Sequence, residues 1–170
     1  MKGHIWFPGN PWPEGHRVDD FSWSGRQGAD GGLWFDLELA TADYDETRNP
    51  PDTEDTGDWA SPIVWTNYHS CMISSTNWGN AIGFPAGDFQ FDRPQRLTAD
   101  TVPNREDPAF HTYLLGHDAV AHHEFEFQPT AAGRWDIVWT GKIALAYIGD
   151  EEFKYSFRAE LDDVEYQPPS

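Results

Sequence analysis

The chain has 170 residues, with 29 Asp and Glu against 11 Lys and Arg, so its formal charge is −18. A polyanion of this kind repels nucleic acid and anionic lipid, which excludes nucleic acids and membrane surfaces as partners. Basic proteins and neutral small ligands remain possible partners. Aromatic residues make up 15% of the chain, which is ample material for a core, so the sequence predicts one folded domain over residues 1–170.

The cysteine content and the first residues indicate a compartment. Cys71 is the only cysteine, so no intramolecular disulfide can form, and a lone thiol is typical of a reducing environment. The stretch from Met1 to Pro8 has no apolar run long enough for a secretion signal. No segment approaches the ~18 apolar residues that a membrane-spanning helix needs. We therefore expect a cytoplasmic protein.

Apolar and polar residues alternate along much of the chain, which is the period of a β-strand, and convincing amphipathic helices are missing. The earliest strand is expected around Phe21 and Trp23. In the next, Leu33, Phe35 and Leu37 share one face, opposite Asp36 and Glu38. Further strands are expected at 63–73, 110–115, 122–127, 135–148 and 153–166, of which the last three form an antiparallel meander.

Proline, glycine and acidic residues mark three irregular stretches. Residues 8–16 hold three prolines, residues 41–58 are strongly acidic, and residues 92–108 are either a crossover or a linker. Together, these patterns predict an all-β protein with little helix. The expected fold is an antiparallel β-sandwich or a jelly-roll-like fold of seven to ten strands with long loops.

The turn near Gly149 allows two registers between the last two strands. A two-residue loop pairs Ile148 with Glu151, whereas a three-residue loop pairs Tyr147 with Phe153 and, further along, Ile143 with Phe157. Large apolar side chains contribute about 1.5–3 kcal/mol each when buried. The three-residue loop is the expected one, because it sets large apolar side chains opposite one another.

A group of histidines suggests a metal site. Four histidines fall between residues 111 and 123, with carboxylates beside them, and such a mixture suits a divalent transition metal. The candidate ligands are His117, His122 and Glu124. Adjacent residues on a strand face opposite sides, so His122 and His123 reach one ion only across a bulge. The alternative places His123 at the core edge and His122 on the surface.

Two weaker candidates are an acidic loop and the thiol. Residues 52–58 offer carboxylates for calcium but lack the ligand ladder of an EF-hand, so a solvated loop is the alternative. His69 and Cys71 share a face of an expected strand, yet no orienting group or nucleophile motif accompanies them. A cysteine packed in the core is favoured.

Tryptophan is abundant, with nine residues, and it gives the best functional hint. Trp34 falls on the polar face of its strand, and Trp6, Trp12 and Trp59 lie in or beside loops. Exposed tryptophan rings often line binding surfaces. The alternative is that loops cover both faces of the sheet and the rings belong to the core.

The recognised catalytic motifs are missing. The chain has no nucleophile elbow, phosphate-binding loop, His-Glu-x-x-His pair or dinucleotide-binding glycine set. We therefore expect a non-catalytic binding domain without a cofactor, whose tryptophans and acidic surface bind a basic protein or a neutral small ligand. One alternative is a metal-dependent enzyme with a His/Glu site in residues 111–126. The other is a glycan-binding module, if a secretion signal has been removed from the chain.

Overall fold

The computed structural model describes residues 2–7, 15–43, 68–76 and 79–170. These residues contain strands, loops and one short 3-10 turn, and no α-helix occurs among them, so the all-β expectation is confirmed. The elements in chain order are β1 (Lys2–Trp6), β2 (His16–Gln27), β3 (Leu33–Thr41), β4 (Met72–Ser74), β5 (Phe84–Pro85), β6 (Gln95–Ala99), β7 (His111–Tyr113), β8 (His117–Ala131), β9 (Arg134–Ala144), η3 (Ala146–Ile148) and β10 (Tyr155–Gln167).

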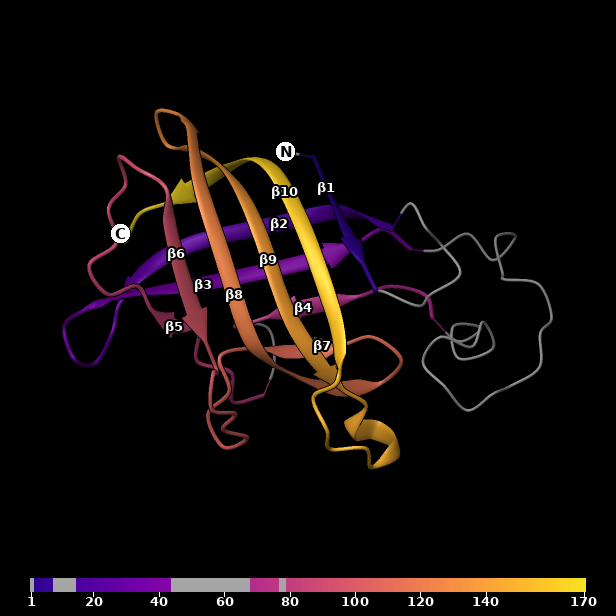
Figure 1. Cartoon of the computed structure of the whole chain (residues 1–170). Coiled ribbons are helices and arrows are strands. Elements are labelled where there is room, and N and C mark those ends of the chain that lie inside the picture. The colour runs from indigo at the N-terminus through magenta and orange to yellow at the C-terminus, as the bar shows by residue number, and fades with distance from the viewer. Residues whose placement is uncertain (1, 8–14, 44–67, 77–78) are drawn as a thin grey trace.

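Eight of the strands close into an antiparallel barrel. β1, β2, β3, β4, β7, β8, β9 and β10 pair with their neighbours in this order, and β10 pairs with β1 to complete the ring. The extra strands β5 and β6 pair with β3 and β8. Figure 1 shows β6, β8, β9 and β10 crossing over β2, β3 and β4. The expectation of a sandwich or jelly roll is not confirmed, because the sheet closes on itself.

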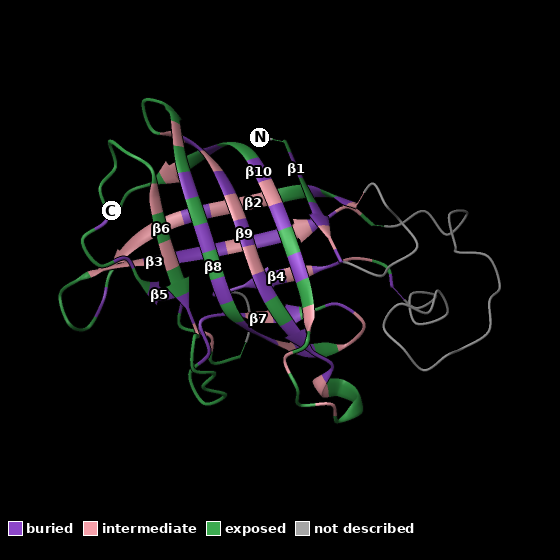
Figure 2. Cartoon of the chain, in the orientation of Figure 1, coloured by how far each residue is buried: buried purple, intermediate pink, exposed green. Residues whose placement is uncertain are grey.

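Side chains from both walls fill the inside of the barrel. Buried positions alternate with exposed or intermediate ones along β8, β9 and β10, as the bands in Figure 2 show. Trp23, Trp135 and Trp139 are at most 2% exposed, so these tryptophans belong to the core. Trp23 lies 4.8 Å from the Phe127 ring and edge-on to Phe35 at 5.2 Å, measured between ring centroids. An eight-stranded barrel is just wide enough for such a packed interior.

Most of the expected strands are present, but several bounds differ. The strand expected at 63–73 falls partly outside the described residues, which contain β4 at its end. The strand expected at 135–148 ends at Ala144. Within residues 92–108 lies β6, and the strands before and after this stretch join the same barrel.

The expected register between β9 and β10 is wrong by two residues. Ile143 pairs with Tyr155, and the connection is longer than a tight turn because it includes η3, which ends at Gly149 in the left-handed conformation. The observed register sets Phe157 opposite Gly141 and Trp139 opposite Ala159. A large side chain thus meets a small one at each position. The expected register would have placed Gly141 opposite Ala159 and Trp139 opposite a leucine, which crowds one site and leaves a void at the other.

Candidate functional site

A β-bulge in β8 organises the surface around the histidines. Ala121 pairs with Lys142 and Glu124 pairs with Thr140, so two residues of β8 stand opposite Gly141. The first of the two, His122, takes a φ of 53°, which is in the left-handed region. Its backbone N–H donates to the Asp100 carbonyl at 3.0 Å, which fastens the bulge to the connection between β6 and β7.

The second residue of the bulge, His123, points into the barrel. It is fully buried, and its Nδ1 accepts a hydrogen bond from the Trp139 indole N–H at 3.1 Å. Burial lowers the pKa of His123 to about 3, so the ring is neutral at neutral pH with its proton on Nε2. The expected division of faces is confirmed, with His123 inside and His122 outside. His123 lies deeper than the core edge.

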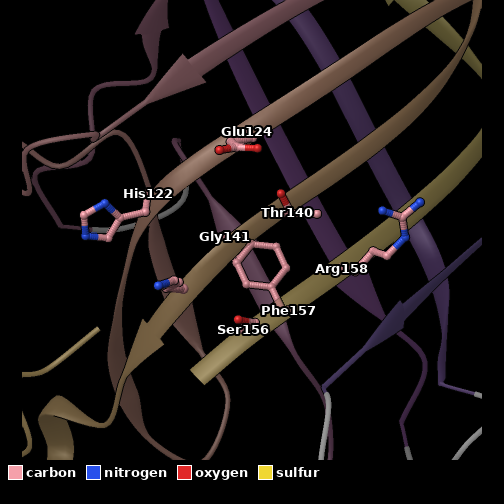
Figure 3. A pocket seen from close by; sticks show the side chains of 8 residues that line it. His122, Glu124, Thr140, Gly141, Ser156, Phe157 and Arg158 are labelled. Carbon is pink, nitrogen blue, oxygen red and sulfur yellow. The ribbon is translucent and has the colours of Figure 1, made fainter. Parts of the chain in front are cut away.

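An outer groove of about 500 Å³ crosses β8, β9 and β10 next to the bulge. Figure 3 shows its side chains, which come from all three strands. Outward positions at its centre carry the short hydroxyl residues Thr140 and Ser156, whereas longer polar side chains surround them. A short side chain between long ones leaves a hollow on the sheet surface. The groove is lined by His122, Glu124, Thr140, Gly141, Lys142, Ser156, Phe157 and Arg158.

A second cavity, the barrel-end pocket, has a volume of about 280 Å³. It is lined by the β6–β7 connection, the β9–β10 connection and the first residues of β8. Figure 1 shows these segments at the lower end of the barrel. Eight of its fourteen lining residues are apolar. The lining residues are Asp100, Pro103, Asn104, Arg105, Pro108, Phe110, His111, His117, Asp118, Ala119, Val120, Ala121, Ala146 and Phe153.

Arg105 joins the two connections that form this pocket. Its guanidinium makes an ion pair with Glu151 and lies over the Phe153 ring, 5.6 Å from the ring centroid. The His122 ring packs against the same Phe153 at 5.9 Å. His122 therefore lines the groove on one side and supports a wall of the pocket on the other.

Three titratable groups of the pocket are shifted by burial. Burial raises the pKa of the Asp100 carboxyl, although the Ala109 N–H donates to its Oδ2 at 2.8 Å. Burial also raises the pKa of Asp118, although the Leu115 N–H donates to its Oδ2 at 3.3 Å. Burial and the nearby His117 lower the pKa of His111. Groups with shifted pKa values that gather in a cavity are typical of functional sites.

The residues expected from the sequence to form a site are dispersed. Trp6 and Trp34 lie half-buried on outward positions of β1 and β3. The Trp34 indole N–H donates to Asp30 at 3.1 Å, and Arg26 covers the ring at 5.2 Å. Trp12 and Trp59 lie outside the described residues.

The three expected metal ligands fall on two surfaces. His117 lines the barrel-end pocket, whereas His122 and Glu124 line the outer groove. In the part of the chain that the structure describes, no group of three His, Cys, Asp or Glu side chains is arranged to hold a metal ion. The acidic stretch expected as a calcium loop, residues 52–58, lies outside the described residues.

Cys71 is a core residue, as expected. It is 1% exposed, and burial raises its pKa to about 12, which is the opposite of an activated nucleophile. His69 is exposed.

Sequence reasoning missed Arg105, Phe153 and Asp100 as pocket residues. Each belongs to a connection whose path the alternation of apolar residues does not describe, so no signal in the sequence brought them together. Of these three residues, only Phe153, at the start of an expected strand, could have been chosen from the sequence as a candidate.

The comparisons with known proteins give no family. No family model, no curated protein and no solved structure matches the chain. Among the described residues, no helix is long and apolar enough to cross a membrane.

Proposed function

We propose that this protein is a non-catalytic binding domain that takes a neutral small ligand in the barrel-end pocket. The observation that carries this proposal is the pocket itself, a cavity of about 280 Å³ whose lining combines eight apolar residues with six polar ones. Small-molecule sites have this composition, and the mouth of a β-barrel is one of their usual places.

The chemistry of the lining defines the ligand class. Phe153, Ala146 and Pro103, which are not fully buried, offer apolar surface for a ring or a short hydrocarbon portion. The Asn104 amide and the Asp100 carboxyl supply hydrogen-bonding groups at the edge. The pocket contains both a guanidinium and carboxyl groups, so a neutral ligand with hydroxyl or amide groups fits it better than a highly charged one.

A metal-dependent enzyme has less support. It requires His117, His122 and Glu124 around one ion, and these residues line two different cavities. The test is the metal content of the His117→Ala/His122→Ala double variant after loading with zinc and removal of excess metal. Stoichiometric zinc in the parent chain that is absent from the double variant would favour the enzyme.

The binding proposal is tested by a ligand-observed NMR screen of neutral ring compounds and simple sugars. Ala119 is half-buried and lines the pocket, so Ala119→Trp should fill the cavity and abolish binding of every hit. Ala40→Trp is the matched control, because Ala40 is also a half-buried, outward-facing alanine, on β3. Hits that bind Ala119→Trp as tightly as the parent chain would contradict a ligand in this pocket.

A further inference from the structure

The outer groove holds charges that are not paired within the protein. In the part of the chain that the structure describes, every arginine and Lys154 has an ion-pair partner, whereas Lys2 and Lys142 have none. Lys142 lies in the groove, and so does Glu124, whose carboxylate also takes part in no ion pair among those residues. In a chain with a formal charge of −18, an unpaired lysine beside an arginine is a distinct local feature.

The strand register fixes how these groups stand. Glu124 lies opposite Thr140, and Lys142 lies opposite Ser156. Thr140 and Lys142 are two residues apart on β9, so Glu124 and Lys142 are diagonal neighbours, about 7–8 Å apart at their Cα atoms. Each charge has a hydroxyl group directly across from it. Thr140 also lies opposite Arg158 on β10. The groove is thus acidic on its β8 side and basic on its β9 and β10 side.

We propose that the outer groove binds a zwitterionic small molecule of the α-amino acid class. The ligand carboxylate pairs with Lys142 and accepts a hydrogen bond from the Ser156 hydroxyl, while its ammonium donates to Glu124 and to the Thr140 hydroxyl. An α-amino acid is short, and it makes a charge-assisted hydrogen bond of about 2.8 Å at each end. Together, these lengths span the gap between the Glu124 and Lys142 side chains.

The overall charge favours a zwitterion over a simple anion. The field of the whole protein repels an anion, because the formal charge is −18, but it does not repel a zwitterion, which has no net charge. A simple cation is attracted at long range but meets Lys142 and Arg158 inside the groove. Arg158 is itself engaged with Glu160 at 2.8 Å, so Lys142 remains for the ligand.

The experiment follows amide chemical shifts of the ¹⁵N-labelled full chain during titration with L-alanine, with acetate and methylammonium as probes of each half alone. We expect L-alanine to shift the amides of residues 124, 140–142 and 156. Acetate and methylammonium should bind far more weakly, because each makes half of the contacts. Glu124→Gln and Lys142→Gln should each weaken L-alanine binding by about tenfold.

Matched controls separate a local effect from the loss of a charge anywhere. Lys2→Gln removes the other unpaired lysine, and Asp162→Asn removes an exposed carboxylate from β10; both should leave L-alanine binding unchanged. Ala119→Trp should also leave it unchanged, since Ala119 does not line the outer groove. Acetate binding as tight as that of L-alanine, or no shift of the groove amides with L-alanine, would each overturn the proposal.

Discussion

The inner and outer faces of β8, β9 and β10 are made from neighbouring residues of the same strands, yet they differ completely in chemistry. Trp139 is fully buried and packs against Phe157 and His123, whereas Thr140 lies on the outside in the groove. On a strand, one step along the chain decides between the two environments. The bulge at His122 changes this assignment, since Asp118 and Val120 point inward before it, and His123 and Phe125 point inward after it.

The bulge thus changes which alternate residues of β8 point into the barrel. It lets the first part of β8 pair with β7 and the second part pair with β6 while both parts keep their apolar side chains inside. It also places His122 outside, between the outer groove and the barrel-end pocket. The two candidate sites therefore depend on the same local irregularity.

The largest difference between the two faces should appear on truncation to alanine. Trp139→Ala removes a fully buried ring from the core and should lower the free energy of unfolding by about 3–5 kcal/mol. Thr140→Ala, one residue along, should change it by less than about 0.5 kcal/mol. Urea unfolding followed by circular dichroism measures both. Comparable losses for the two variants would show that the assignment of faces is wrong.

Acid should affect the inner face through His123. Its pKa of about 3 lies below the ordinary 6.5, so the unfolded chain takes up a proton that the folded chain refuses, and stability falls as the pH drops from 6.5 towards 3. Between pH 7 and 4.5, His123 should account for a loss of about 3 kcal/mol. His16, with a pKa lowered by burial to about 4, adds a loss of the same sign.

Urea unfolding of the parent chain and of His123→Phe at both pH values isolates this contribution. The variant loses the Trp139 hydrogen bond and starts less stable, but its loss between pH 7 and 4.5 should be smaller by about 3 kcal/mol. His122→Asn, which keeps the buried ring, should retain the parental loss. An equal loss in His123→Phe would contradict a buried neutral imidazole.

The bulge itself can be tested at His122. A β-branched residue is strongly disfavoured at positive φ, so His122→Val should cost about 1–2 kcal/mol. His122→Gly and His122→Asn tolerate this conformation and should stay within about 0.5 kcal/mol of the parent chain. Glu124→Val, on the same face where β8 is extended, is the matched control and should have little effect. A tolerated valine at 122 would mean that the bulge is not there.

The sequence could predict the inward and outward positions of the last three strands, because alternation of residues such as Phe125, Glu126 and Phe127 is a local property. It could not predict the β9–β10 register, since that depends on large side chains meeting Gly141 and Ala159 across the strands. Barrel closure through β1 and β10 joins the two ends of the chain, and no local pattern reports it. The barrel-end pocket could not be predicted for the same reason, because its walls are connections that only the closed barrel brings together.

The smallest effect is expected for the charges of the outer face. Arg158 and Glu160 form an ion pair at 2.8 Å, but the two side chains are 50% and 46% exposed, and water screens such pairs. Arg158→Ala should therefore lower the free energy of unfolding by less than about 0.5 kcal/mol, near the limit of urea unfolding. Gly141→Ala, one position from Thr140, is the opposite case, because the added methyl group would lie 2.7 Å from the Phe157 ring and 2.9 Å from the His123 Nδ1. It should cost about 1–3 kcal/mol. If Arg158→Ala lowers the free energy of unfolding as much as Gly141→Ala does, then the outer face contributes to the stability of the fold as well as to binding. In that case, substitutions of groove residues would not test the proposed amino acid site alone.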